Sequence, residues 1–410
     1  MGIQSGSATF TRFFVPDPVT EDFWSYVDEK LQAGSFKGIE EGEEQAAGFA
    51  SWDDFFDSSF PYGSYHKGEY VAFNFRLDQR KVPAIITKQY VREAVQKFRQ
   101  EHDEKWPSRR ERADIQENIK NFLLNRSFPQ PSACEVVWNP AGKWMIVGTT
   151  STKMMEAFLE LFESLFRLYP MPLYHVHWGL NMIPLDERSK DVLNSMVSVK
   201  SPQAMEEGRY LGHEFLTWFW FLTEQTDGVI RISDEKQVEV NLGERLVLTL
   251  PGEGKERVIC TTQANALHEA RTALQQGKMV EELQMFLRIG ENEYLLTMDS
   301  SLWAVKGLKA PKQLPDFDKD DPDGRFLEKM YFIEEITAAI NAIYGQFLSQ
   351  RLGPGWESDT LPVFKQWIAG NAEEGERVRP ERSREVEAEP AGTSTEIGRD
   401  MGTEDESAPF

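Results

Sequence analysis

Two adjacent helical segments, separated by a helix breaker, constrain the fold more than any other feature of the sequence. Residues 86–105 are predicted to form a helix because apolar residues recur there at helical spacing. Trp106 and Pro107 end this helix, and Ser108 with Glu111 forms a capping box that starts the next one. The apolar residues of the two helices are Tyr90, Val91, Ala94, Phe98, Ile115, Ile119, Phe122 and Leu123. Residues 86–131 are therefore predicted to form a helical hairpin, here called the arm.

The segments around the arm combine strand and helix patterns. Residues 70–77 alternate between apolar and polar types, which predicts a half-buried strand. The turn sequence 139–142, Asn-Pro-Ala-Gly, predicts a β-hairpin between strands at 134–138 and 144–148. A strand at 10–15, short strands around Phe36 and Phe49, and helices at 18–31 and 152–168 are also predicted. These segments are predicted to form an α+β module.

The second half of the chain is predicted to form another α+β module. The helices expected there are a buried one at 209–225, one at 265–276, a long one at 324–351 and a short one ending near Trp367. The strands expected there are 229–232, 238–240, 246–250, 257–261, 279–288 and 294–298. The predicted divisions are residues 1–85, the arm at 86–131, residues 132–200 completing the first module, the second module at 201–370, and a tail at 371–410.

The composition indicates a globular protein of a reducing compartment. Hydrophobic residues make up 40% of the 410 residues and aromatic residues 12%, which is enough for packed cores. The two cysteines, Cys134 and Cys260, lie in apolar segments and are predicted to be buried thiols. The first residues lack the basic and apolar regions of a secretory signal, and the longest apolar block, 215–222, is too short to span a membrane. We therefore expect a cytoplasmic protein without membrane contact.

The net charge limits the ways in which the chain could bind nucleic acid. The formal charge is −22, and subtracting the −7 of residues 371–410 still leaves −15 on residues 1–370. That tail has 12 acidic and 5 basic residues without an apolar period, so it is predicted to be disordered. Because the whole chain repels polyanions, a polyanionic partner has to meet a local basic patch.

Three groups of basic residues are candidates for such a patch. Residues 88–128 of the arm contain ten Lys or Arg and seven acids, a local charge of +3. Arg76, Arg80 and Lys81 end the strand before the arm, and Lys306, Lys309 and Lys312 form a group without an acid. Clusters of this kind neutralise phosphates, although each alone is also typical of an ordinary solvated surface.

Motifs for catalysis are weak. His175 and His177 would share one face of a strand, but no third metal ligand is evident and a structural role is favoured. The acidic segment 316–324 fails the EF-hand pattern, because Lys319 and Met330 fall where carboxylates are required. No phosphate-binding glycine loop is present, so no cofactor is predicted. A metal-dependent nuclease with scattered carboxylates, and a protein-only adaptor that uses the acidic surface, remain alternatives.

Several short motifs resemble the RdgC family of recombination-associated proteins. The resemblance rests on Pro83 with Ile86-Thr87-Lys88-Gln89, the charged helix after it, Leu123-Leu124-Asn125-Arg126-Ser127-Phe128, Val136-Val137-Trp138, Gly277-Lys278-Met279-Val280, Leu295-Leu296-Thr297-Met298 and Lys306-Gly307-Leu308-Lys309. These motifs occur in the family's order, and the likeness extends over most of residues 8–370.

The resemblance implies a ring-forming α+β subunit with antiparallel sheets, a helical finger and a long C-terminal helix. It implies a homodimeric ring that encircles double-stranded DNA without sequence preference, restrains RecA-driven recombination and associates with the nucleoid. No catalysis is expected from it, although an older label for the family is exonuclease. In the family the arm is a finger with a phenylalanine at its tip, and Phe128, beside Arg126, matches that residue.

Two parts of the chain depart from the family pattern. A lysine-rich turn that contacts DNA in the family corresponds to residues 260–263, where Thr262 and Gln263 stand instead. Residues 201–250 and the tail have no counterpart. The predicted DNA-binding residues are Arg76, Arg80, Lys81, Lys88, Arg92, Arg109, Arg110, Arg112, Arg126, Phe128, Gln263, Lys278, Lys306 and Lys309, with no catalytic residue and no metal ligand.

Overall fold

The computed structural model describes residues 2–16, 22–40, 42–173, 175–198, 202–250, 256–261, 266–311 and 321–370. Residues Met1–Asn371 form one compact unit. The tail at 371–410, predicted to be disordered, lies outside the described residues.

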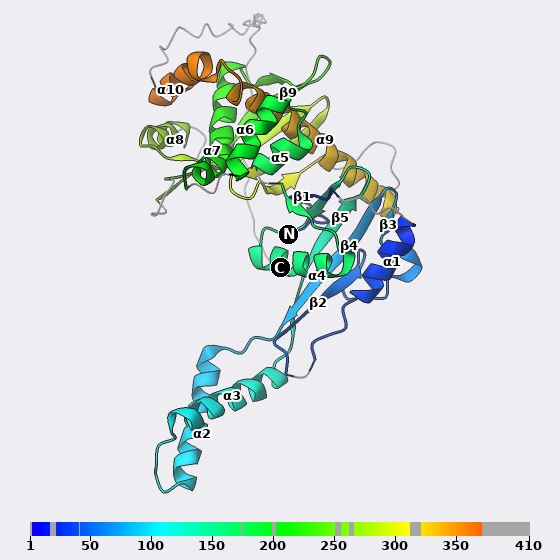
Figure 1. Ribbon diagram of the computed structural model, residues 1–410, viewed down its shortest axis with the longest axis vertical. Coiled ribbons are helices and arrows are strands. Elements are labelled where there is room, and N and C mark those ends of the chain that lie inside the picture. The colour runs from blue at the N-terminus through cyan, green and yellow to red at the C-terminus, as the bar shows by residue number, and fades with distance from the viewer. Residues whose placement is uncertain are drawn as a thin grey trace, which may run out of the picture. The chain divides into compact units, whose positions relative to one another are not determined.

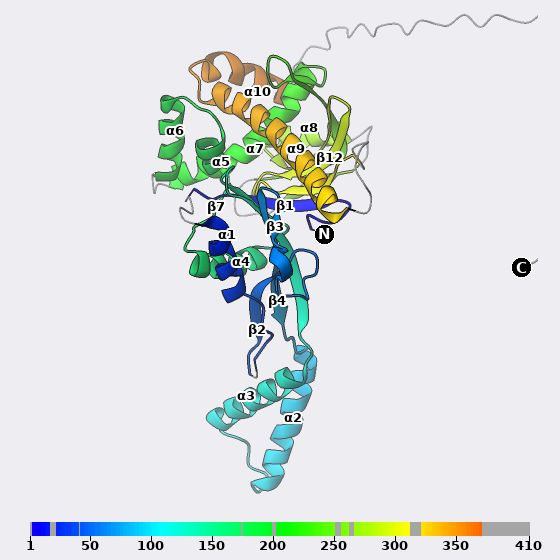
Figure 2. The ribbon, with the colours of Figure 1, turned by 90° about the vertical axis from the view of Figure 1, so that its right-hand side faces the viewer.

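Helices and strands follow each other as in an α+β protein, which confirms the predicted class. The strands are β1 Ala8–Phe14, β2 Gln45–Ser51, β3 His66–Lys67, β4 Tyr70–Gln79, β5 Gln130–Asn139, β6 Trp144–Val147, β7 Met171–Pro172, β8 Val229–Arg231, β9 Gln237–Thr249, β10 Arg257–Cys260, β11 Met279–Ile289, β12 Asn292–Asp299 and β13 Val305–Lys309. The helices are α1 Phe23–Ala33, α2 Ala84–Glu101, α3 Arg109–Arg126, α4 Thr152–Phe166, α5 His175–Met182, α6 Glu187–Ser198, α7 Pro202–Gln225, α8 Ala266–Gln275, α9 Pro322–Arg351 and α10 Leu361–Ala369. Figures 1 and 2 show their arrangement.

The described strands form one antiparallel sheet with the order β10-β9-β11-β12-β13-β1-β6-β5-β4-β2. Strand β1 joins the sheet's two halves. Its residue Ala8 pairs with Leu308 of β13, whereas Phe14 pairs with Trp144 of β6. The register of the pairing with β13 shifts between Ala8 and Phe10, and the pairing with β6 begins at Thr11. The first strand of the chain thus belongs to both predicted modules.

The N-terminal half-sheet has one core under helices α1 and α4. Helix α4 contributes Phe158, Phe162 and Phe166, all with no exposed surface, and α1 contributes Val27 and Leu31. The helical spacing of these residues explains why one face of each helix is apolar. The predicted helix at 152–168 and the predicted β-hairpin of β5 and β6 are confirmed.

The opposite face of the same half-sheet is covered by α9. Phe326 of α9 packs edge-on against Trp52 and against Tyr70 of β4. Strand β4 is therefore buried on both faces over most of its length, and the predicted half-buried strand is wrong in this respect. Alternating polarity alone did not indicate that a distant helix covers the second face.

Helix α9 also packs against the C-terminal half. Its Tyr344 stacks on Trp178 of α5 with ring centroids 4.4 Å apart, and Phe347 lies 5.3 Å from Trp218 of α7. Its start is held to the N-terminal half by Lys67, whose Nζ lies 2.7 Å from Asp323 Oδ1. The long C-terminal helix that the sequence predicts is confirmed, and it braces both halves of the sheet (Figure 2).

Smaller differences from the predicted elements follow from tertiary packing. The segments 238–240 and 246–250 belong to one long strand, β9, which pairs with β11 along its length through register shifts. Phe36 lies outside any strand. Both cysteines are buried free thiols, as predicted. None of the helices in the described part of the chain is long and apolar enough to cross a membrane.

His175 lies in helix α5, not in a strand, so the predicted strand face shared with His177 does not exist. The imidazole is 5% exposed, its Nδ1 has no hydrogen-bond partner among the described residues, and its ring centroid lies 5.1 Å from that of Trp303. Burial lowers the pKa of His175 to about 3 from an ordinary value of 6.5. The residue is a neutral core histidine, which agrees with the structural role favoured from the sequence.

This histidine predicts a pH dependence of stability. Between pH 6.5 and about 3 the unfolded chain binds a proton that folded His175 does not bind. The free energy of unfolding should therefore fall as the pH falls below 6.5, by up to about 1.4 kcal/mol per pH unit. Urea unfolding at neutral pH and at about pH 5 measures this slope. In His175→Phe the slope should be smaller by this amount, while His177→Phe should keep it; equal slopes in all three proteins would contradict the assignment.

Candidate nucleic-acid interface

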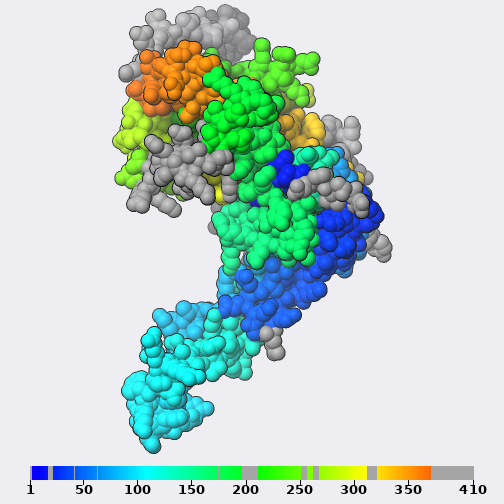
Figure 3. Space-filling view, viewed as in Figure 1, coloured from blue at the N-terminus to red at the C-terminus, as the bar shows by residue number. Residues whose placement is uncertain are grey.

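The arm leaves the sheet at the end of β4 and returns to it at the start of β5. Helix α2 runs outward, and α3 runs back to the sheet (Figures 1 and 2). The predicted capping box starts α3: the Glu111 amide donates to Ser108 Oγ at 3.3 Å, and the Ser108 amide donates to Glu111 Oε2 at 2.8 Å. Figure 3 shows the surface of the arm, in cyan, extending beyond that of the blue strands.

The two helices of the arm enclose almost no core. Only Leu124 is buried among the residues of α2 and α3, although Tyr90 and Phe122 lie with ring centroids 6.3 Å apart. The residues of the predicted apolar stripes are thus only partly buried, and Tyr90 and Phe122 are exposed. Helices with so little burial depend on their capping and on partners for stability, and they leave space between them.

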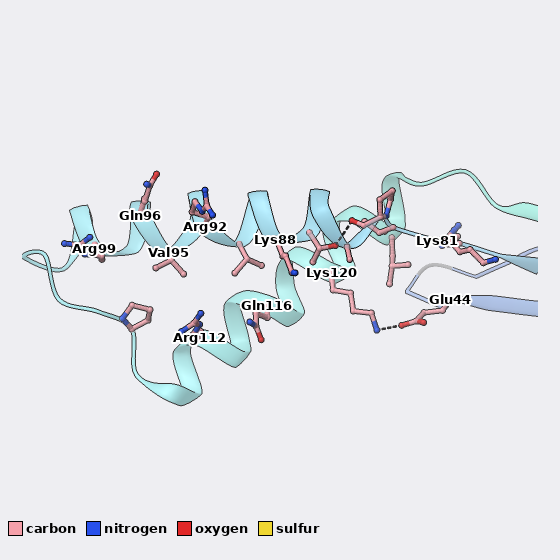
Figure 4. A pocket seen from close by; sticks show the side chains of 18 of the residues that line it. Glu44, Lys81, Lys88, Arg92, Val95, Gln96, Arg99, Arg112, Gln116 and Lys120 are labelled. Carbon is pink, nitrogen blue, oxygen red and sulfur yellow. Dashed lines mark hydrogen bonds and ion pairs between the residues drawn. The ribbon is translucent and has the colours of Figure 1, made fainter. Parts of the chain in front are cut away.

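That space is a groove with a cavity volume of about 1630 Å³. It lies between α2 and α3 and extends to the base of the arm (Figure 4). Its floor is partly apolar, with Val91, Val95 and Leu124. Its polar and charged lining residues are Glu44, Arg80, Lys81, Thr87, Lys88, Arg92, Gln96, Arg99, Arg112, Gln116, Lys120 and Gln130.

The charges of the arm are sorted between this groove and the outer surface. Of the ten basic residues at 88–128, a stretch described in full, five line the groove: Lys88, Arg92, Arg99, Arg112 and Lys120. None of the seven acids in that stretch lines it. With Arg80 and Lys81 at the base, the groove has seven basic residues against the single acid Glu44. The net charge of residues 88–128 is +3, whereas the net charge of the residues that line the groove is +6. A groove with this charge favours a polyanion.

Helical periodicity produces this sorting. Lys88, Arg92 and Gln96 follow each other at intervals of four residues on α2, and Arg112, Gln116 and Lys120 do so on α3. Residues four apart lie on one face of a helix, so each helix presents one polar row to the groove. Figure 4 shows these side chains on the two helices.

Some of the basic groups are already engaged. Lys120 pairs with Glu44, Arg99 pairs with Glu104 and stacks over Trp106 at 4.4 Å, and Arg80 Nη1 donates to a backbone carbonyl at 3.2 Å. By contrast, no ion pair joins Lys81, Lys88, Arg92 or Arg112 to any residue that the structure describes. Those four cations are available for phosphate groups without breaking an existing pair.

Of the predicted DNA-binding residues, the structure brings Arg80, Lys81, Lys88, Arg92 and Arg112 together in the groove. Arg109, Arg110 and Arg126 are exposed on the arm but do not line the groove, and Arg126 stacks on Phe122 at 4.0 Å. Sequence reasoning did not select Arg99 and Lys120. Arg99 lies seven residues after Arg92, and Lys120 lies eight residues after Arg112. These helical spacings indicate that each lies on the same helix face as a selected residue.

Three other predicted residues are held within the fold. Arg76 makes two 2.7 Å hydrogen bonds to Asp78. Lys278 is 8% exposed and pairs with Glu256 at 3.3 Å, and Lys306 pairs with Glu282 at 3.0 Å. Lys306 also pairs with Asp299, and these carboxylates raise its pKa against the lowering effect of burial. Binding of DNA by these side chains would require these pairs to break.

Of the remaining predicted residues, Lys309 is exposed at the end of β13, and Gln263 lies outside the described residues. Lys312, named with the Lys306 group, also lies outside them. The described residues therefore concentrate the predicted phosphate contacts in the arm.

Phe128 does not lie at the tip of the arm, contrary to the expectation from the resemblance. It follows α3 and stands two residues before Gln130, which pairs with Gln79 at the start of the sheet, so it lies at the base. Its side chain is 90% exposed, which excludes packing under the hairpin. The aromatic residue at the far end of the arm is Trp106, 71% exposed.

The residues that the structure describes contain no group of three or more His, Cys, Asp or Glu placed to hold a metal ion.

Comparison with known proteins identifies one family. Residues 15–178, which include the whole arm and the groove, match the family model described as "Putative exonuclease, RdgC". No curated protein sequence matches the chain.

Proposed function

We propose that this chain, whose residues 15–178 match the model of the recombination-associated RdgC family, binds double-stranded DNA without sequence preference. We propose further that it acts as a non-enzymatic homodimeric ring that modulates RecA-dependent recombination or replication, in the cytoplasm at the nucleoid. The observation that carries the proposal is the sorting of charge into the arm groove.

The chemistry of the groove suits a nucleic-acid backbone. Lysine and arginine side chains without ion-pair partners contact phosphates, and such contacts position a duplex without reading its sequence. Gln96 and Gln116, which lie in the same rows, add hydrogen-bond donors for phosphate or sugar oxygens. The strongly negative charge of the rest of the chain would confine the DNA to this surface.

Affinity for duplex DNA is expected to fall steeply with salt. If the four unpaired cations of the groove each neutralise a phosphate, the slope of log affinity against log salt should be about −4 per arm. Fluorescence anisotropy of a labelled duplex at several salt concentrations measures this slope, and duplexes of unrelated sequence should give the same value. An affinity that does not change with salt would contradict the proposal.

The alternative of a metal-dependent exonuclease follows from the description of the matched family. It is tested by incubating end-labelled duplex with the protein and Mg²⁺ or Mn²⁺. We expect the labelled strand to keep its length. Shortening that requires the metal and persists through purification would replace the non-enzymatic proposal.

A further inference from the structure

A second cavity lies between the N-terminal half-sheet and helices α5 and α9. Its volume is about 310 Å³, which is in the lower range of small-molecule sites. It is lined by Arg12, Glu69, Asn139, Trp144, Met145, Ile146, Leu173, Trp178, Met182, Ile333, Glu334, Thr337, Ala338 and Asn341. Mostly apolar walls with a few polar groups are typical of sites for small organic ligands.

The notable group in this cavity is Arg12 of β1. The residue is 5% exposed, and its guanidinium lies over the ring of Trp178 at 4.1 Å. Its Nη1 donates to Asn341 Oδ1 at 3.3 Å, and both Trp178 and Asn341 line the same cavity. The guanidinium is therefore fixed on two sides at the wall of the cavity.

The remaining donors of Arg12 are unsatisfied. Its Nε and Nη2 are buried without a hydrogen-bond partner, and it makes no ion pair with any described residue. These two nitrogens share one edge of the guanidinium, the edge that binds a carboxylate or phosphate through two parallel hydrogen bonds. Burial lowers the pKa of Arg12 to about 10, so the side chain stays charged at neutral pH. A buried charge with a free edge is costly unless a counter-ion joins it.

The other polar groups of the cavity restrict the ligand. Glu334 accepts a hydrogen bond from the Tyr70 hydroxyl at 2.7 Å, and Glu69 accepts one from Asn139 at 3.4 Å. Both carboxylates retain further acceptor capacity. They disfavour a ligand with several negative charges and favour a hydrogen-bond donor away from its anionic group.

We propose that this cavity binds a small organic monoanion, whose carboxylate pairs with Arg12 while its apolar body packs against Trp144 and Met182. The site is separate from the groove of the arm and does not depend on DNA binding. Neither the family match nor the charge of the arm assigns it.

The full-length protein is tested with three probes of similar size by isothermal titration calorimetry. Benzoate carries the candidate anionic group, phenyl phosphate is a control with nearly two negative charges at neutral pH, and benzylamine is the cationic control. Benzoate should bind with a stoichiometry of one and more tightly than phenyl phosphate, and benzylamine should not bind. Absence of benzoate binding, or equal binding of phenyl phosphate or benzylamine, would overturn the proposal.

Three variants locate the binding. Arg12→Met keeps the length of the side chain and removes its charge, and it should weaken anion binding about tenfold or more. Ala338→Phe, at an exposed position of the lining, should block the cavity while it leaves Arg12 intact. The groove variant Lys88→Gln with Arg92→Gln and Arg112→Gln should bind the anion as the parent does. Unchanged binding in both cavity variants, or loss of binding in the groove variant, would show that the anion binds elsewhere.

The melting temperature separates a ligand site from a purely structural arginine. Because the free edge of Arg12 lacks a partner, Arg12→Met is expected to melt no lower than the parent without ligand. The parent alone should gain melting temperature with the anion. If Arg12→Met does not fold, Ala338→Phe with its intact charge still decides whether the anion occupies this cavity.

Discussion

Replacing Lys88, Arg92 and Arg112 together with glutamine is expected to weaken binding of duplex DNA on the order of a hundredfold near physiological salt. The three side chains line one groove, and none makes an ion pair with a described residue, so their loss should not disturb the arm. The slope of log affinity against log salt should become shallower by about 3 at the same time. Fluorescence anisotropy over a range of salt concentrations measures both quantities.

The matched control keeps the number of charges removed and changes only their place. Lys97, Lys105 and Arg110 belong to the same arm but lie outside the groove. Their joint replacement with glutamine should alter the affinity far less than the groove variant does. Equal losses in the two triple variants would mean that the arm acts through its total charge, and the groove would then have no special role.

The base of the arm is tested separately with Arg126→Ala combined with Phe128→Ala. The exposed ring of Phe128 and its neighbour stand where the arm joins the sheet. The change is expected to weaken DNA retention or ring closure without unfolding the protein. Gel filtration and anisotropy together distinguish the two effects, and a variant that matches the parent in both would count against a role for this base.

The largest effect on stability is expected for Trp303→Ala, which should lower the free energy of unfolding by about 3–5 kcal/mol. Trp303 has no exposed surface and lies between β12 and β13 with φ of 50°. Its ring centroid lies 4.9 Å from Trp178, 5.1 Å from Phe215 and 5.4 Å from Tyr344. The residue thus joins helices α5, α7 and α9, and its removal leaves a cavity among aromatic rings that cannot collapse easily.

Urea unfolding of the parent, Trp303→Ala and Trp106→Ala tests this expectation. Trp106 is of the same residue type but is 71% exposed at the far end of the arm, so its replacement should change the free energy of unfolding by no more than about 0.5 kcal/mol. Both changes remove an indole ring, so the difference between their free energies of unfolding reports the burial of Trp303. Similar costs for both would mean that the cluster around Trp303 contributes little.

Local signals in the sequence predicted local structure well. The capping box of Ser108 and Glu111 and the turn after Asn139 act within a few residues, and both stand where they were expected. The helix before the capping box, α2, ends at Glu101, earlier than the predicted end at residue 105. The long helix α9 was also evident from its length and helical pattern. These features depend on backbone conformation that neighbouring side chains determine.

Features that depend on distant segments were not predictable in this way. Helix α9 covers β4, and Tyr70 contacts Phe326 although the two residues lie far apart in the sequence. Strand β4 is therefore buried, whereas the sequence predicted a half-buried strand. The placement of His175 in a helix of the core has the same cause.

The candidate groove lies between these two cases. Its basic rows at intervals of four residues are present in the sequence, but the opening between α2 and α3 is not, because the apolar stripes predicted only a helical hairpin. The resemblance suggested the arm as the DNA-binding element, yet it placed Phe128 at the wrong end. No pattern in the sequence indicated that Arg12 is buried with two unpaired nitrogens, because β1, α5 and α9 together bury this side chain.

The position of β1 has a consequence for synthesis of the protein. Its residues Thr11–Phe14 can pair with β6 early, but Ala8 and Phe10 find their partners only in β13, near residue 305. On the ribosome, β1 emerges long before β13 and must therefore keep part of one edge unpaired while residues 148–304 are made. Such an edge is a template for wrong pairing with other chains. We therefore expect the nascent chain to need protection at β1 until β13 has been translated.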